Sequence, residues 1–382
     1  MKFIKRFLQI ILVIIVLIII GLYATGTDYL IKAVRCTYLQ GHTTASIDDA
    51  QYFDQNLILA NQPTPWKKHE LYNTFELTDS LKNELKRFKT AQFVIIKDGK
   101  LLYDNAFRTD LETFNSFSMT KSITTLLLGF AIQDGYIESV NQKMIDFLPE
   151  YKDDSFGKKV TVGDLAKMSS GYGWVEDYYW PVNAITDSYY GDDVEKVVFD
   201  VPFVEEPGQR YEYLSGATQL LGITIKRATN KSLSSYLQEK VWNPLGMETD
   251  AQWTVDHQGG TEKAFCCLRA KALDYAKIGQ FLLQDGQWNG KQILNKEFVT
   301  LMKTPDLDPI YGYSLWIDQN YKHPFYMLRG HLGQYTIIVP DQNLVIVRLG
   351  EIRDKREHDL GEHPLDVYIF IEETLKSLQN PI

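Results

Sequence analysis

The sequence has few cysteines, and their spacing does not resemble a metal site. Only three occur in 382 residues, Cys36, Cys266 and Cys267, and no two of them form a C-x-x-C pair. This scarcity excludes a disulfide framework and a cysteine-based zinc site. A bridge from Cys36 to one of the adjacent pair is open to the chain in an oxidising compartment, but we expect three buried free thiols. We expect no metal and no cofactor.

Clusters of basic residues are also lacking. Lysine and arginine together number 40 against 49 acidic residues, which gives a formal net charge of −9 at pH 7. An acidic chain without a basic run is a poor candidate for binding nucleic acid. The hydrophobic share of 45% and the charged share of 23% are typical of a folded globular protein. The length suffices for one large domain or two intimate ones.

A long apolar run occurs only at the N-terminus. Three cations, Lys2, Lys5 and Arg6, precede the segment 7–22, which is interrupted only by Gln9. As a helix this segment is about 24 Å long at about 1.5 Å per residue, slightly short for a hydrocarbon core of about 30 Å, although the next two residues extend it. We therefore interpret residues 1–26 as a transmembrane anchor.

The flanking charges predict how this anchor is oriented. Basic residues stay on the cytoplasmic side, so the N-terminus is expected inside the cytoplasmic membrane and everything after Gly26 outside, in the periplasm or the extracellular space. A cleavable signal peptide is the alternative, because Ala24-Thr25-Gly26 is a passable small-x-small cleavage site. Both interpretations export the rest of the chain.

The exported part predicts an α+β fold. Residues 27–87 are expected to form an extracytoplasmic lead-in and residues 88–380 a catalytic domain. This domain opens with a hairpin at 92–107, around Asp98-Gly99, and continues through a mostly helical insert at about 122–262. It returns to strands and ends in a helix at about 365–378, so one antiparallel sheet, split in the sequence, is flanked by helices.

A serine and a lysine lie three positions apart in "FNSFSMTKSI", residues 114–123. Asn115 or Ser116 is expected to cap the helix that follows, which places Ser118 in the first turn, where free backbone N–H groups favour negative charge. Positions i and i+3 share a helix face, so Lys121 is within reach of the Ser118 hydroxyl. Such a pair can act as nucleophile and base. Alone the pattern is weak, because both residue types are common.

Two further stretches strengthen this hypothesis. "EEPGQRYEYLSGATQLLG", residues 205–222, contains Tyr213-Leu214-Ser215, and "LRGHLGQYTIIVPDQNLVIV", residues 328–347, contains His331-Leu332-Gly333. With S-x-x-K, these stretches resemble the serine β-lactamase and penicillin-binding-protein superfamily in its class C-like branch, where the later motifs are Y-x-N or Y-x-S and K-T-G or H-x-G. The resemblance covers about residues 85–375 and is strongest to 6-aminohexanoate-dimer hydrolases. It implies a β-lactamase/transpeptidase-like fold.

The resemblance also implies catalytic roles. Ser118 attacks the substrate carbonyl and becomes an acyl-enzyme, while Lys121 takes its proton or holds the tyrosine in a state that can. Tyr213 returns a proton to the leaving group and then helps to activate water. The backbone N–H groups of Ser118 and Gln334 form the oxyanion hole. Ser215 is expected to hydrogen-bond to Lys121 or to the substrate.

Three further residues are assigned to substrate binding. His331 and Gly333 belong to the last motif, where His331 replaces a lysine and is expected to be a weaker, pH-dependent cation. Tyr178, in "SSGYGWVEDYYW", matches a tyrosine that contacts the substrate amide in 6-aminohexanoate-dimer hydrolases. The histidine, and Ser215 in place of an asparagine, argue against efficient hydrolysis of β-lactams and favour another amide or an ester.

Two functions therefore remain open on the sequence. The first is an extracytoplasmic serine hydrolase whose substrate is a small-molecule or short-peptide amide or ester. The alternative is a catalytically weak, penicillin-binding-like protein that binds or senses cell-wall peptides or lactams. The membrane, through residues 1–26, is the other expected partner.

Overall fold

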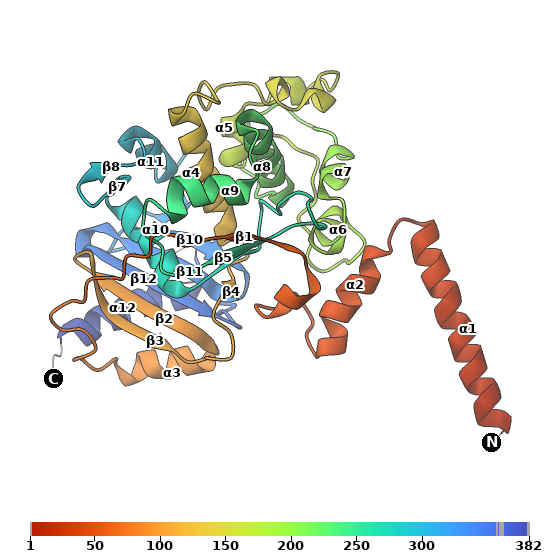
Figure 1. The fold of residues 1–382 in the computed structure, drawn as a ribbon, viewed down its shortest axis with the longest axis horizontal. Coiled ribbons are helices and arrows are strands. Elements are labelled where there is room, and N and C mark those ends of the chain that lie inside the picture. Colours follow the sequence, from red (N-terminus) through yellow and green to blue (C-terminus); the bar gives the residue numbers. More distant parts are fainter. Residues whose placement is uncertain (1, 357, 359–362, 380–382) are drawn as a thin grey trace.

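A six-stranded antiparallel sheet lies at the centre of one half of the molecule (Figure 1). The computed structural model describes residues 2–356, 358 and 363–379. The strand order is β3-β2-β12-β11-β10-β9, so the first strands of the domain pair with the last. The strands are β2 (Thr90–Lys97), β3 (Lys100–Ala106), β9 (Trp316–Asp318), β10 (Phe325–Gly330), β11 (Gln334–Val339) and β12 (Leu344–Gly350). The predicted sheet, split in the sequence, is confirmed.

The hairpin β2–β3 turns at the predicted dipeptide. Asp98 and Gly99 have φ values of 53° and 73°, the left-handed conformation that a tight hairpin requires. Both faces of the sheet are covered by helices: α3 (Asp79–Arg87) and α12 (Leu365–Gln379) pack on one face, and α10 (Ala272–Leu283) packs on the other. Because both faces are covered, β11 and β12 are buried along their whole length.

The other half of the molecule is mostly helical (Figure 1). Its helices are α5 (Val162–Ala166), α6 (Ala184–Tyr190), α7 (Val194–Phe199), α8 (Ser215–Thr229) and α9 (Leu233–Leu237). A small sheet lies beside them, in the order β1 (Gln55–Ile58), β5 (Ala251–Thr254), β6 (Leu268–Ala270) and β4 (Phe114–Asn115). The remaining short elements are β7 (Gln287–Trp288), β8 (Lys291–Gln292) and α11 (Lys296–Met302).

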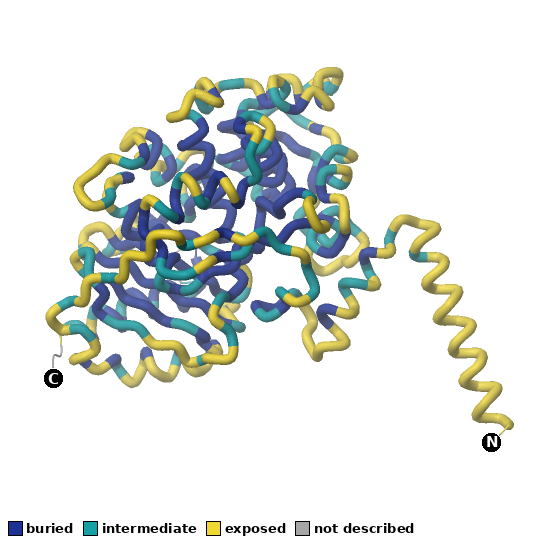
Figure 2. Tube along the Cα trace, viewed as in Figure 1, coloured by how far each residue is buried: buried dark blue, intermediate teal, exposed yellow. Residues whose placement is uncertain are grey.

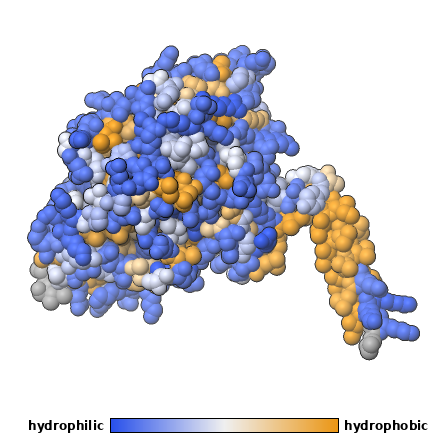
Figure 3. Space-filling model, in the orientation of Figure 1, coloured by the Kyte–Doolittle hydropathy of each residue, from blue (hydrophilic) through white to orange (hydrophobic). Residues whose placement is uncertain are grey.

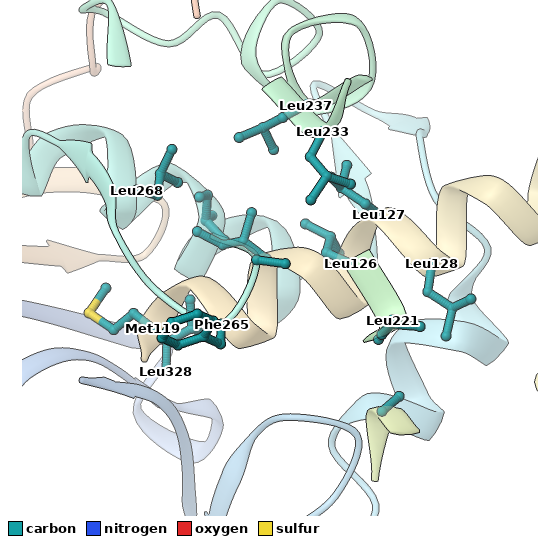
Figure 4. Packing of buried hydrophobic residues seen from close by; sticks show 14 of the residues in the cluster. Met119, Leu126, Leu127, Leu128, Leu221, Leu233, Leu237, Phe265, Leu268 and Leu328 are labelled. Atoms are coloured by element: carbon teal, nitrogen blue, oxygen red, sulfur yellow. The ribbon is translucent and has the colours of Figure 1, made fainter. Parts of the chain in front are cut away.

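Helix α4 (Met119–Gln133) joins the two halves. Every residue from Met119 to Ala131 is buried, because the sheet lies on one side of the helix and α8 and α9 lie on the other. Figure 4 shows leucines of α4 near others from α8 and α9, while Met119 lies close to Phe265 and Leu328. Truncating one buried leucine typically costs about 2–5 kcal/mol. This packing holds the start of α4, and the residue before it, in a fixed place.

The N-terminal helix α1 (Lys2–Ala24) extends away from the body (Figures 1 and 2). It is exposed along its length, with a mean hydropathy of 3.0, and is long and apolar enough to cross a membrane. Its surface is apolar except at the N-terminal end, which carries the basic residues (Figure 3). The chain then forms α2 (Tyr29–Cys36), which packs on α6. The predicted boundaries of the anchor, the lead-in and the catalytic domain stay predictions.

The cysteines differ from the prediction at two of three positions. Cys266 and Cys267 form a disulfide between neighbours, with their Cα atoms 3.7 Å apart, so the expectation of free thiols there is wrong. Cys267 has a φ of 75°, and this left-handed residue lets adjacent side chains face each other. Cys36 is buried and free, as expected.

Candidate active site

Ser118 and Lys121 are in direct contact. The Lys121 Nζ atom lies 3.0 Å from Ser118 Oγ and also donates to the backbone carbonyl of Phe265 at 3.0 Å. The lysine is only 1% exposed, and no carboxylate in the described part of the chain forms an ion pair with it. Its Nζ atom lies 5.0 Å from the ring centre of Tyr213. The structure thus brings the hydroxyl, the amine and the phenol ring together, as the three motifs imply.

Ser118 is the residue immediately before α4 rather than part of its first turn. It has φ −65° and ψ −7°, and its side chain makes no capping bond. The two expected caps have other partners: the Asn115 side chain accepts from the Phe117 N–H at 2.9 Å, and the Ser116 hydroxyl bonds to Thr120. The capping prediction is therefore wrong. Because it caps nothing, the Ser118 hydroxyl is left to face the amine.

Tyr213 is half-buried among aromatic rings. Its ring lies 5.3 Å from that of Trp316 and 6.0 Å, perpendicular, from that of Tyr311. The guanidinium of Arg329 stacks on Trp316, with its central carbon 3.6 Å from the ring centre. No carboxylate among the described residues pairs with this arginine, and desolvation lowers its pKa. The sequence analysis did not single out Arg329, which adds a positive charge beside the tyrosine.

Ser215 faces a different partner from the one expected. Its hydroxyl and its backbone N–H donate to the carboxylate of Glu176, at 2.5 and 2.7 Å. No described contact joins it to Lys121, so the first of its two expected partners is wrong. Tertiary packing explains the difference. The loop after Gly173 folds back over the start of α8 and supplies the Glu176 carboxylate, and a hydrogen bond to a charged acceptor is stronger than one to a neutral acceptor.

Glu176 lies in the acidic pair next to Tyr178, and the motifs in the sequence give it no role of its own. Besides Ser215, it accepts from the Trp174 indole N–H at 2.9 Å and from the Tyr178 hydroxyl. The alternation Trp174, Glu176, Tyr178 is a signal that could have been used, because alternate residues of an extended segment point to the same side. The alternation could not reveal that Glu176 pairs with Ser215, which lies 39 residues further along the chain.

His331 lies between two aromatic rings at the edge of the site. Its ring is perpendicular to that of Phe117 at 5.5 Å and nearly parallel to that of Tyr178 at 6.4 Å, and its Nε2 atom is 3.2 Å from the Thr44 hydroxyl. Although solvent reaches part of the side chain, desolvation by these neighbours, together with the charge of Arg353, lowers the pKa of His331 to about 4. This downward shift favours the neutral imidazole near pH 7, and the expected pH-dependent cation stays a prediction.

Gly333 gives the last motif its backbone shape. Its φ is 82°, and a Cβ atom there would lie 2.6 Å from the guanidinium of Arg348. Arg348 is fully buried and donates to the carbonyls of Leu332 and Gly333, at 2.9 and 2.8 Å. A side chain at Gly333 would displace this arginine, so the glycine is required by the turn that follows His331.

Gln334 ties the same turn to the end of β12. Its side chain bonds to the carbonyl of His331 and to both backbone groups of Gly350. Across from it, Gly330 lies so close to the carbonyl of Ser116 that a Cβ atom would be 2.1 Å away. The turn and the start of α4 are thus in contact, which is the arrangement that the predicted oxyanion donors, at Ser118 and Gln334, require. Among the described residues, no group of three His, Cys, Asp or Glu side chains gathers as metal ligands would.

Comparisons with known proteins agree with this architecture. The family model described as "Beta-lactamase" matches residues 78–362. The structure titled "Putative 6-aminohexanoate-dimer hydrolase from Bacillus anthracis" has a similar fold, with a TM-score of 0.73, 20% identity, and coverage of 87% of this chain and 92% of that one. The octameric penicillin-binding protein homologue from Pyrococcus abyssi gives a TM-score of 0.57 at 21% identity, covering 79% of this chain and 76% of that one.

A curated relative is similar in sequence as well. The 6-aminohexanoate-dimer hydrolase of Paenarthrobacter ureafaciens is 23% identical over 232 residues, which span 57% of this chain and 58% of that protein. The solved structures, at these identities, show the fold alone, whereas the family model covers most of the chain. The fold, with the three motifs in contact at the start of α4, and the match over residues 78–362 lead to one conclusion: the chain belongs to the beta-lactamase family.

Proposed function

We propose that this protein is a serine hydrolase of the class C-like type, which cleaves an amide or an ester through an acyl-enzyme on Ser118. The observation that carries the proposal is the 3.0 Å contact between Lys121 Nζ and Ser118 Oγ, made by a buried lysine that has no carboxylate partner in the described chain. A lysine so placed exchanges its proton with the hydroxyl rather than with an acid.

The reaction proceeds in two halves. In the first, Lys121 accepts the proton of the Ser118 hydroxyl as Oγ attacks the carbonyl carbon, and the backbone N–H groups of Ser118 and Gln334 stabilise the oxyanion. Such donors are typically worth about 3–4 kcal/mol of the barrier. Tyr213 returns a proton to the leaving group. In the second half, water attacks the acyl-enzyme with help from Tyr213, and the serine is regenerated.

The substrate is an amide or ester rather than a good β-lactam. The support is the last motif, in which His331 is neutral near pH 7, so this site lacks the fixed cation that a lysine would bring. The name of the Paenarthrobacter relative points the same way, because the two units of an amino-acid dimer are joined by an amide. Tyr178, next to His331, contacts the substrate amide in this proposal.

The catalytic domain works outside the cytoplasmic membrane, to which residues 1–26 anchor it with the N-terminus inside. The support is α1, exposed and apolar, with basic residues at its N-terminal end. A cleaved signal would export the same domain in soluble form. Mass measurement of the protein purified from membranes distinguishes the two, because cleavage removes the first residues.

The test is turnover combined with intact mass. The full chain in detergent should hydrolyse short-chain nitrophenyl esters or linear amide dimers faster than nitrocefin, and a serine-directed phosphonate should add one adduct, on Ser118. Ser118→Ala protein should do neither. Activity equal to the wild type in Ser118→Ala protein contradicts the proposal, and a lasting penicillin adduct without any turnover would identify the binding or sensing protein instead.

A further inference from the structure

An exposed aromatic segment lies at the rim of the active site. Its large apolar side chains are mostly out of contact with the body: Tyr179 is 99% exposed, and Trp180 is 63% exposed. Of the seven tryptophans in the chain, Trp180 is the only one exposed to this degree. Val175, Tyr178 and Val182, in the same segment, are exposed as well. Apolar surface gathered in one exposed stretch is typical of a site that another surface covers.

This segment is tied to the active site at its start. Tyr178 lies against the His331 ring and donates to Glu176, which in turn holds Ser215. Tyr179 and Trp180 follow directly, with their backbone N–H groups bonded to the Asp177 side chain. The aromatic tip is thus continuous with the site, and what covers the tip lies beside Tyr178 and His331.

The other end of the segment reaches the membrane helix. A cavity of about 930 Å³ lies between the two: Tyr23 and residues 25–27, where α1 ends, line one side, and Val182 and Asn183 line the other. Trp180 is two residues before Val182, within about 7 Å along an extended chain. Residues at the end of a membrane span lie at the membrane surface, so the aromatic segment lies there too.

Helix α2 presents a second apolar surface at the same level. Four residues separate it from the end of α1, and with the turn that follows it exposes Ile31, Val34, Tyr38 and Leu39. The opposite face, with Tyr29 and Cys36, is buried against the body. An amphipathic helix directly after a membrane span, with its apolar side outward, is typical of a segment lying in the lipid interface.

The charges nearby indicate which lipid surface fits. The cavity wall carries the acidic residues Asp28, Asp187, Asp192, Asp193 and Asp200 against the cations Lys32, Arg35 and Lys196. This excess of acid does not favour anionic headgroups, so the contact depends on aromatic and aliphatic side chains. Tryptophan and tyrosine are the residues that prefer the headgroup level of a bilayer.

We infer that residues 177–182 and the exposed face of α2 lie in the headgroup region of the membrane that α1 crosses, and that the active site takes its substrate from that surface. The substrate class is an amphiphilic amide or ester whose apolar part stays in the bilayer while its carbonyl reaches Ser118. The part of this inference that concerns the substrate rests on the proposed hydrolase function, whereas the part that concerns the surface does not.

The position of the segment is tested first. The full chain is placed in phosphatidylcholine vesicles with acyl chains brominated near the headgroup, since bromine quenches tryptophan at short range. Wild-type emission should fall by a larger fraction than that of Trp180→Phe protein, which keeps an aromatic ring but lacks this fluorophore. Equal quenching of the two proteins overturns the inference.

The substrate class is tested with two esters of one leaving group. Nitrophenyl palmitate in the same vesicles is the membrane-borne substrate, and nitrophenyl acetate is the water-soluble one. The double variant Tyr179→Ser/Trp180→Ser should lose about tenfold on the palmitate and nothing on the acetate, because only interfacial contact is removed. The control Tyr136→Ser, an exposed aromatic beyond the other end of α4, should match the wild type on both.

Unchanged palmitate turnover in the double variant, or an equal loss on both esters, overturns the inference about the substrate. Wild-type protein that hydrolyses neither ester contradicts the proposed function itself. In that case the quenching difference still decides where the segment lies, because it does not depend on catalysis.

Discussion

Two lysines of the described chain are buried without an ion pair, and only one of them has a nucleophile beside it. Lys121 and Lys263 are 1% and 0% exposed, and no carboxylate in the described chain forms an ion pair with either. Lys263 donates to the carbonyls of Tyr189 and Gly191 and lies 5.1 Å from the Phe53 ring. Lys121 has a carbonyl and a ring as well, but also the Ser118 hydroxyl at 3.0 Å.

Burial alone does not make a lysine a candidate base. Burial lowers the pKa of Lys263 to about 7, which by itself would suit a general base. Yet the hydrogen-bond partners of its amine are carbonyl oxygens, and these have no proton to give. Perturbed titration therefore does not identify the active site here, whereas a hydroxyl within hydrogen-bond distance does.

The largest expected effect comes from replacing each lysine by methionine. Lys121→Met should reduce kcat/KM for the best ester by about a thousandfold or more, because the serine loses its base. Lys263→Met should keep wild-type turnover per folded molecule, since its site holds no nucleophile. Turnover of both variants is measured on the full chain in detergent, with circular dichroism as a check of folding. Comparable losses of turnover in the two variants would contradict this distinction between the two lysines.

The second effect concerns how Lys263 makes the stability of the folded protein depend on pH. The pKa of Lys263 is about 7 in the folded protein and about 10.5 when the side chain is solvated, so between these values the unfolded chain binds more protons. Stability from this group therefore rises as pH increases from about 7 to 10.5, by a few kcal/mol. The difference in unfolding free energy between wild type and Lys263→Met, from urea titrations at several pH values, should show this rise. A difference that is flat across this range would show that the amine titrates normally.

Local patterns in the sequence predicted what depends on near neighbours. The hairpin at Asp98-Gly99 and the closing helix α12 each follow from residues a few positions apart. The pairing of Ser118 with Lys121 is of the same kind, because a helix places i and i+3 side by side. The family resemblance then predicted that Tyr213 comes to this pair.

Contacts that depend on tertiary packing could not be predicted from such patterns. Glu176 meets Ser215 across 39 residues, and Thr44 meets His331 across 287. The groups that lower the pKa of His331 also come from distant segments, so residue type alone did not indicate this shift. The Cys266–Cys267 disulfide depends on a single left-handed residue, for which the sequence holds no glycine signal.

A smaller effect is expected from Glu176, which bonds to Ser215 and Tyr178 near the Lys121 site. Glu176→Gln keeps the size of the side chain but removes the charge and one acceptor, so Tyr178 and Ser215 lose a charge-assisted partner. We expect KM for an amide substrate to rise about tenfold with a smaller change in kcat, because positioning rather than chemistry is affected. Asp177→Asn, next along the loop, is the matched control. If kcat falls and KM does not, Glu176 acts in the chemical step.

The smallest effect is expected from the titration of His331, whose pKa is lowered by desolvation. With a pKa of about 4, this imidazole is neutral throughout the range between about pH 5 and pH 8. Profiles of kcat/KM against pH should therefore have the same shape over this range in wild type and in His331→Asn protein, with rates that differ only a few-fold. Suppose instead that the wild-type profile has a step near pH 6.5 which the variant lacks. The imidazole would then titrate as in water, and the expectation of a pH-dependent cation in this motif would be restored.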